Sequence, residues 1–280
     1  MIEFFEALQA VPLLRYALLA GIFSSFAFGV VGSFVVTRRI GYIAAAIAHS
    51  ILGGIGAAIF FSRTFDLQWL TPMVGAFIAA LVSALVIGLV SLRAREREDT
   101  IIGAIWTIGM ATGLIFMHYA PGPGANLESY IFGNILLTGE SDVHATAILS
   151  LVVLAVTALF YHKLVAVCFD EEFARLRGVR SGAYFLLLLV LLAVSVVLLV
   201  RLTGIILAIA LIVLPAATAS KMAKRLWIIM IFAVALSLVY TVSGLAVSYV
   251  AEMPTGPVIV LIAAVGYTLM LISRRCLAKA

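Results

Sequence analysis

The sequence predicts an all-α fold, an integral membrane bundle of about nine transmembrane helices, from its composition, its apolar runs and the positions of its charges. Of its 280 residues, 65% are hydrophobic and 11% are charged, whereas soluble domains have about 45–50% apolar and about 25% charged residues. The apolar excess extends along the whole chain, so we expect one membrane domain over residues 1–280. This composition excludes soluble enzymes, nucleic-acid-binding proteins and secreted disulfide-bonded scaffolds.

Nine apolar runs come close to the roughly 20 residues that a helix needs to cross a bilayer. Their expected limits, in order, are 12–36, 42–61, 70–92, 99–119, 143–166, 182–201, 203–220, 226–250 and 256–273. The first run ends at Arg38 and Arg39, and clusters of Lys and Arg also accompany the ends of the third, fifth, seventh and ninth runs. Because only Arg201 and Leu202 separate the sixth run from the seventh, counts of eight and ten remain open.

The charges predict the orientation of the bundle. With nine spans, fifteen of the eighteen Lys and Arg residues lie on one set of alternate connections, and Arg15, Arg63 and Arg201 lie on the other. Basic residues favour the cytoplasmic side, so we expect the N-terminus outside and the C-terminus inside. The acidic residues of the outer connections are Glu3, Glu6, Asp66, Glu128, Glu140, Asp142 and Glu252. This negative surface would attract cations, although translocated loops also lack Lys and Arg for topological reasons alone.

The longest outer connection, about residues 120–142, begins with the sequence PGPG. Its apolar middle, 131–137, is too short to span and is expected to be re-entrant or interfacial. Imidazole and carboxylate groups ligate transition metals, so residues of those types near this loop are candidates for an outer cation vestibule. These candidates are His118, Glu128, Asp142 and His144. The alternative is that they are solvated loop residues.

His49 lies inside the second apolar run, in the sequence GYIAAAIAHSILGGIGAA. An ionisable group within a span usually faces the bundle interior, and its helical neighbours Ala45 and Gly53 are small enough for another helix to approach closely. A neutral imidazole there can ligate zinc, manganese or iron; alternatively, it forms a hydrogen bond to a neighbouring helix. In the fourth run Gly109 and Gly113 form a GxxxG motif, which predicts a tight helix contact.

Two segments on the expected cytoplasmic side are suited to contact a partner protein. In GIILAIALIVLPAATASKMAKR (204–225), Pro215 is expected to interrupt the helix and to free the carbonyl of Leu211, although an ordinary kinked span end would have the same sequence. In DEEFARLRGV (170–179), acidic residues at the start, basic residues at the end and a final glycine predict a short surface helix with Phe173 and Leu176 on one side. That helix would contact a partner or rest on the membrane.

These segments together resemble the permease subunits of zinc, manganese and iron ABC importers. The resemblance is collinear through GSFVVTRRIGYIAAAIAHSILGG (32–54), EDTIIGAIWTIGMATGL (98–114), ESYIFGNIL (128–136), DEEFARLRGV (170–179), LIVLPAATASK (211–221) and EMPTGPVIVL (252–261). It implies a multi-pass permease of the plasma (cytoplasmic or inner) membrane that pairs with a second copy. Two ATP-binding subunits would dock on its cytoplasmic face, and an extracytoplasmic solute-binding protein would deliver the metal.

By the same resemblance, ATP is bound by the partner subunit, no cofactor is bound permanently, and the chain is a transport subunit rather than an enzyme. The contact with the ATPase is expected first in the stretch after the proline, at Pro215, Ala216, Ala217, Thr218, Ala219, Lys221 and Arg225. The helix at 170–178, with Phe173 and Arg175, is the second choice.

One position departs from the family pattern. The family's second helix carries an Asp one turn before the His, and the pair is associated with metal coordination; this chain has Ala45 there. The predicted function is import of a divalent transition metal, and the departure keeps a metal chelate or other small cargo open. An ion-coupled secondary transporter is disfavoured because no Asp or Glu lies inside a confident span. An intramembrane enzyme is disfavoured because His49 is the only buried candidate acid–base group.

Overall fold

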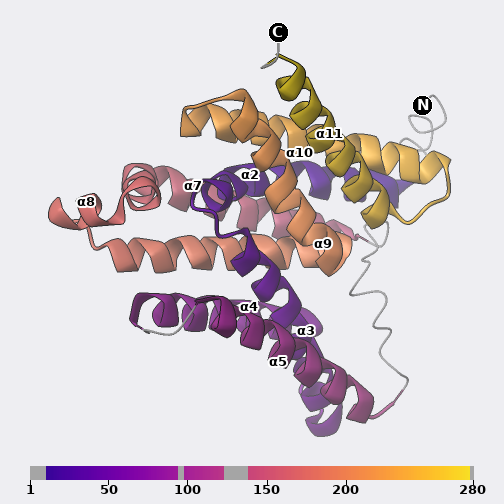
Figure 1. Cartoon of the computed structure of the whole chain (residues 1–280). Coiled ribbons are helices and arrows are strands. Elements are labelled where there is room, and N and C mark those ends of the chain that lie inside the picture. Colours follow the sequence, from indigo (N-terminus) through magenta and orange to yellow (C-terminus); the bar gives the residue numbers. More distant parts are fainter. Residues whose placement is uncertain (1–10, 94–97, 123–137, 278–280) are drawn as a thin grey trace.

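The computed structural model describes residues 11–93, 98–122 and 138–277, and within these ranges it contains helices and their connections but no strand. The helices are α2 (Pro12–Thr37), α3 (Gly41–Phe65), α4 (Pro72–Arg93), α5 (Glu98–Tyr119), α7 (Glu140–Phe169), α8 (Glu171–Leu176), α9 (Ser181–Met222), α10 (Leu226–Val250) and α11 (Thr255–Leu277) (Figure 1). Eight helical segments of the described chain are long and apolar enough to cross a membrane. The predicted all-α membrane bundle is therefore confirmed. The proposed re-entrant piece at 131–137 lies outside the described residues.

Local sequence signals set several of the helix ends. Pro12 occupies the first turn of α2, where its missing N–H is not needed. The chain leaves α2 through Arg39, whose φ of 60° is in the left-handed region. α3 likewise ends at Asp66, which adopts a left-handed conformation with φ of 52°. Such residues stop the helical hydrogen-bond pattern and turn the chain.

α9 shows where the sequence-based count of nine spans differs from the structure. The sixth and seventh predicted runs are two helical halves of α9 that meet at a kink, where Gly204 has the non-helical backbone angles φ 79° and ψ 173°. Figure 1 shows that the second half of α9 runs at a steep angle to the first half. Its apolar portion, Ala208–Met222, is shorter than the eight spanning segments. The expected interruption at Pro215 is wrong in its position, because the helix continues through that proline and breaks at Gly204.

Two groups of helices make up the bundle. α3 packs against α4 and α5, and α4 connects this group to α9. α2 packs against α7, α9 and α10, and α11 packs on α9 and α10. In Figure 1 the first group lies below the second, with α9 between them. A buried cluster dominated by Ala, Ile, Leu and Val extends from one group into the other.

Glycines permit the close approach of helices in the first group. A Cβ added at Gly54 or at Gly75 would meet the carbonyl oxygen of the other glycine. A Cβ added at Gly109 would lie 2.5 Å from the Cα of Ser50, and one at Gly113 would meet the backbone of Leu52. The tight contact predicted from the GxxxG motif is therefore present, between α5 and α3.

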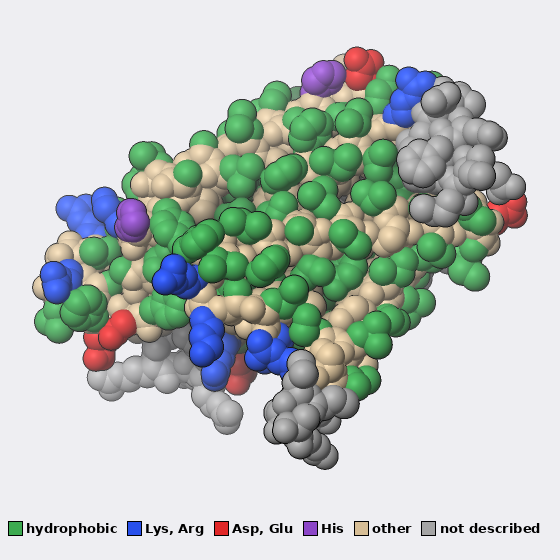
Figure 2. All heavy atoms as spheres, turned by 90° about the horizontal axis from the view of Figure 1, so that it is seen from above, with side chains coloured by type: hydrophobic (Ala, Val, Ile, Leu, Met, Phe, Trp, Pro, Cys, Tyr) green, Lys and Arg blue, Asp and Glu red, His purple; other side chains and the backbone are tan. Residues whose placement is uncertain are grey.

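The surface has the pattern of a protein embedded in lipid. Figure 2 shows hydrophobic side chains across most of one face, with Lys and Arg gathered toward one side of the molecule. The large exposed hydrophobic residues include Leu151 on α7 and Ile231 on α10. Exposure of so large an apolar surface to water would be energetically unfavourable, so this face fits the hydrocarbon core of a bilayer.

Candidate functional site

His49 lies at the interface of α3 and α5, the most closely packed pair of helices in the structure. Its imidazole stacks on the indole of Trp106, with ring centroids 4.3 Å apart and ring planes 11° apart. The indole Nε1 of Trp106 donates to the sulfur of Met110, at 3.2 Å. The Nδ1 atom of His49 is buried and has no hydrogen-bond partner. Stacking therefore fixes the ring while one ring nitrogen stays uncommitted, as a transient ligand requires.

In the described part of the chain, His49 does not belong to a cluster of strong metal ligands. Ala45, one helical turn earlier, is 7% exposed and carries only a methyl group. Among the described residues, no group of three or more His, Cys, Asp or Glu side chains gathers closely enough to hold a metal ion. His49 therefore offers a single imidazole without an enclosing set of ligands among the described residues.

A mainly apolar cleft with three hydroxyl side chains lies beside this interface, and no sequence pattern predicted it. Ser83 Oγ donates to Ser50 Oγ at 2.7 Å, and Ser50 Oγ donates to the carbonyl of Ile47 at 2.8 Å. These serines and Thr112 line a cavity of about 280 Å³ between α3, α4 and α5. The two serine hydroxyls are bonded to each other and to a backbone carbonyl, so they lie in this mainly apolar cleft without an unsatisfied donor.

The outer candidates are dispersed. His118 is exposed at the end of α5, where its ring meets Tyr119 edge-on. His144 is exposed on α7, and its Nδ1 lies 3.0 Å from the carbonyl oxygen of Glu140. Asp142 accepts a hydrogen bond from the N–H of Gly139 at 3.1 Å and so caps α7. Glu128 lies outside the described residues, and the described candidates do not form a ligand cluster.

The expected surface helix at 170–178 is present as α8. Asp170 caps it by accepting from the N–H of Phe173 at 2.9 Å, and the chain turns at Gly178, where φ is 78°. Ala174 is 1% exposed, whereas Phe173 is 52% and Leu176 86% exposed. α8 thus buries one small side chain against the bundle and presents two large apolar side chains to its surroundings.

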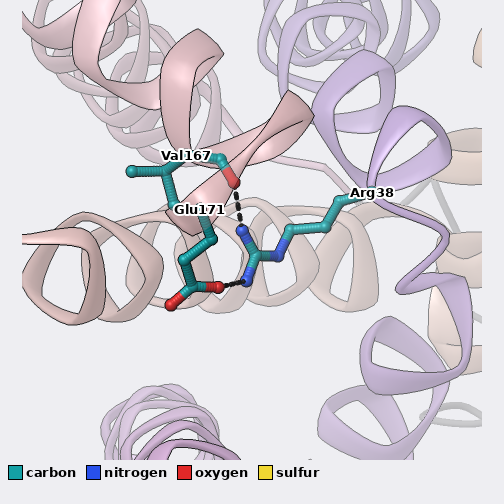
Figure 3. Close-up of polar contacts among 3 residues, drawn as sticks. All are labelled: Arg38, Val167 and Glu171. Atoms are coloured by element: carbon teal, nitrogen blue, oxygen red, sulfur yellow. Dashed lines mark hydrogen bonds and ion pairs between the residues drawn. The ribbon is translucent and has the colours of Figure 1, made fainter. Parts of the chain in front are cut away.

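Arg38 joins α8 to the transmembrane helices, and this contact was not predicted. Its guanidinium lies 2.7 Å from the carboxylate of Glu171 and donates to the carbonyl of Val167 (Figure 3). Its face packs 4.3 Å from the ring centroid of Phe185. Its side chain is only 17% exposed, so this pair is better shielded from solvent than an ordinary surface ion pair. One side chain at the end of α2 therefore holds α7, α8 and α9 together.

The stretch after Pro215 is mostly internal. Ala216 and Ala219 are fully buried in a cluster with residues of α2 and α10, and Thr218 is 2% exposed. Pro215 is also buried, and Ala217 and Lys221 are half-buried; Arg225, just before α10, is exposed. In this chain, only the last residues of the first-choice coupling segment reach the surface.

The comparisons with known proteins agree with this architecture. The profile of the ABC 3 transport family matches residues 10–274. The chain belongs to this family. A protein of Chlamydia muridarum named "Probable metal transport system membrane protein" is 37% identical over 264 residues, which cover 94% of this chain and 90% of the relative. The manganese transport system membrane protein MntC of Halalkalibacterium halodurans is 30% identical over 266 residues, 95% of this chain and 89% of MntC.

Solved structures extend the comparison to the fold. PsaBC of Streptococcus pneumoniae, solved in complex with a Fab, matches with a TM-score of 0.84 at 29% identity, over 96% of this chain and 95% of that one. An ABC transporter in an inward-facing conformation matches with a TM-score of 0.71 at 16% identity, over 94% and 85% of the chains, and supports the fold alone. The predicted resemblance to ABC metal-importer permeases is confirmed, and the chain is a multi-pass protein of the plasma membrane.

Proposed function

We propose that this chain is the permease subunit of an ABC importer for a divalent transition metal, with manganese as the first candidate and zinc and iron as competitors. The names of its relatives support the metal and the manganese assignment. The single structural observation that carries the proposal is His49, a ring fixed inside a membrane bundle with an unpaired, buried Nδ1. Imidazole nitrogen suits zinc and iron, whereas manganese prefers oxygen ligands, so the manganese assignment is supported by the names of the relatives rather than by the imidazole.

His49 would act as a relay ligand rather than a storage site. A passing cation would lose part of its water shell, and one imidazole would replace part of it. Because Ala45 contributes no carboxylate, the ion is held weakly by one chain and leaves easily. A second permease copy would supply further ligands, and a solute-binding protein outside would supply the ion.

ATP hydrolysis would take place on a separate ATP-binding subunit, and we propose that this subunit contacts α8. Ala216 and Ala219 are buried in the bundle, which makes the stretch after Pro215 a poor docking surface. Phe173 and Leu176 of α8 are exposed and apolar, as a protein contact requires.

Arg38 would transmit a movement of α8 to the transmembrane helices. It binds Glu171 of α8 and ends the helix that directly precedes α3, on which His49 lies. A shift of α8 toward or away from the bundle would therefore pull on the junction of α2 and α3. The contact is a rigid link between the proposed ATPase contact and the proposed metal path.

A metal chelate remains the second candidate cargo. The observation that favours it is the missing carboxylate at Ala45 together with the absence of a three-ligand cluster among the described residues. A cargo whose metal is already coordinated needs fewer protein ligands.

Uptake by the reconstituted complex of permease, ATPase and binding protein tests the proposal. We expect ATP-dependent accumulation of radioactive manganese that excess zinc or iron reduces, and no accumulation without ATP. Accumulation of a metal only when a chelator accompanies it would favour the chelate. Accumulation driven by an ion gradient without ATP would contradict the ABC mechanism.

A further inference from the structure

A basic groove lies at the end of the bundle, next to the ATPase contact proposed on α8. It is a cavity of about 760 Å³ lined by Phe160, Lys163, Arg177, Gly178, Val179, Arg180, Ala183, Tyr184 and Leu187. It is bounded by the last turns of α7, the connection from α8 to α9, and the first turns of α9. Three of its lining residues are cationic and none is acidic.

Lys163 is positioned by two aromatic rings, and none of the three cations of the groove is neutralised by a described residue. Lys163 Nζ lies 5.4 Å from the ring centroid of Tyr184 and 5.9 Å from that of Phe160. These cation–π contacts position the ammonium group without removing its charge. Lys163, Arg177 and Arg180 form no ion pair with another described residue, and all three are exposed. The groove therefore attracts an anion.

The groove lies at the depth of lipid headgroups. α7 has 30 residues, so it is about 45 Å long, and the hydrocarbon core of a bilayer is about 30 Å thick. An untilted α7 centred in the bilayer would extend beyond the hydrocarbon core at both ends. Lys163 lies within two turns of the last residue of α7, which puts its ammonium group near the boundary between hydrocarbon and headgroups.

An apolar track on α7 leads to the groove from the membrane. Ile148 is 62%, Val152 49% and Leu159 76% exposed. Together with Lys163, these residues follow one face of the helix at spacings of four and seven residues. This face is available to an acyl chain, and its last member is the lysine of the groove.

We propose that the groove binds the phosphate headgroup of an anionic glycerophospholipid, whose acyl chain lies along this face of α7. Arginine and lysine bind phosphate through charge-assisted hydrogen bonds, and basic pockets between transmembrane helices bind anionic headgroups. The acyl-chain track distinguishes a lipid from a soluble phosphate. The lipid bridges α7 and the start of α9, next to α8, and so stabilises the end of the bundle at which the ATPase is proposed to dock.

Lipid retention by the full-length permease tests this binding in the absence of the ATPase. The chain is reconstituted in nanodiscs of phosphatidylcholine with a minor share of phosphatidylglycerol, extracted in mild detergent, and its co-purifying lipids are counted by mass spectrometry. The variant Lys163→Gln/Arg177→Gln/Arg180→Gln should retain roughly tenfold less phosphatidylglycerol or lower still, since each base contributes separately. The matched control Lys221→Gln/Lys224→Gln/Arg225→Gln removes the same charge from another connection and should retain as much as the wild type.

Two further measurements separate lipid binding from loss of fold and from binding of soluble phosphate. The charge-conserving variant Lys163→Arg/Arg177→Lys/Arg180→Lys should retain phosphatidylglycerol, which separates loss of charge from loss of fold. Soluble glycerol phosphate should not displace the lipid; if it does so at millimolar concentration, the groove is a soluble-phosphate site and the proposal is wrong. Equal loss in the groove variant and the control variant would also overturn it, because retention would then depend on net charge alone.

Discussion

Arg38 is the residue that connects the proposed ATPase contact on α8 to the transmembrane helices. Its guanidinium contacts a carboxylate on α8, a carbonyl on α7 and an aromatic ring on α9. The sequence identified it only as half of a basic pair at the end of a span. Its partners Val167 and Glu171 lie more than a hundred positions away along the chain, so no local pattern could have named them. The same holds for the stacking of Trp106 on His49, which depends on the packing of α5 against α3.

We predict that the Arg38–Glu171 pair couples ATP hydrolysis to transport. Glu171→Gln should lower the number of metal ions imported per ATP hydrolysed by several-fold, since a partly shielded ion pair contributes about 1 kcal/mol and its loss frees α8. Arg38→Gln should act in the same direction, and the double variant should be no worse than Arg38→Gln alone. The ratio of uptake to phosphate release in proteoliposomes measures this.

Glu172→Gln is the control for that cycle. Glu172 occupies the same first turn of α8 but is exposed, so its neutralisation should leave the ratio unchanged. If Glu171→Gln and Glu172→Gln lowered the ratio equally, coupling would depend on the overall charge of α8, and the proposed role of the Arg38–Glu171 ion pair would be contradicted.

At the scale of single elements, helix ends were predictable and the break inside α9 was not. Charges, Pro12 and the cap at Asp170 act locally, and the sequence contains them. Gly204 was inconspicuous, because a glycine in an apolar run is compatible with a continuous helix; its positive φ comes from the packing of α9. The interruption was predicted at Pro215 because a proline usually kinks a helix.

α8 should be the element that docks the ATPase. Leu176→Ser removes an 86% exposed apolar side chain, and we expect at least tenfold weaker binding of the ATP-binding subunit with no change in permease stability, since burial of a leucine contributes about 1.5–3 kcal/mol. Lys224→Ser, in the connection after α9, serves as the comparison. Microscale thermophoresis with the detergent-solubilised permease measures the affinity of each variant for the ATP-binding subunit. If Lys224→Ser weakened binding of the ATP-binding subunit and Leu176→Ser did not, the ATPase would dock on residues 221–225 and this prediction would be wrong.

The contact between α3 and α5 should tolerate no added carbon. Gly109→Ala places a methyl group 2.5 Å from the Cα of Ser50 and should cost about 1–3 kcal/mol in stability through overpacking. Gly103→Ala is the matched control on the same helix, because a Cβ there meets nothing within 4 Å; it should be neutral or slightly stabilising. Thermal unfolding in detergent distinguishes them, and equal melting temperatures would contradict the close contact.

For the whole molecule, the bilayer explains both the apolar surface and the arrangement of charges. The predicted topology has the N-terminus outside and the C-terminus inside, and it requires the second half of α9 to cross the membrane as a separate span, the seventh of nine in chain order. In a background with Cys168→Ala and Cys276→Ala, a cysteine at Ser141 should react with a membrane-impermeant maleimide added outside intact cells. Cysteines at Arg175 and Lys224 should react only after permeabilisation. Labelling of positions 141 and 175 from the same side would contradict this topology.

The most direct test of the account is ATP-dependent manganese uptake by the complete transporter carrying His49→Ala. If the imidazole is a ligand on the metal path, uptake should fall by roughly tenfold or more, since a metal–imidazole bond is lost where no second ligand replaces it. His144→Ala, which removes an exposed imidazole at the end of α7, should keep wild-type uptake, and both variants should assemble with the ATPase. Wild-type uptake by His49→Ala for manganese, zinc and iron alike would show that His49 is a packing residue and would contradict the proposed metal path.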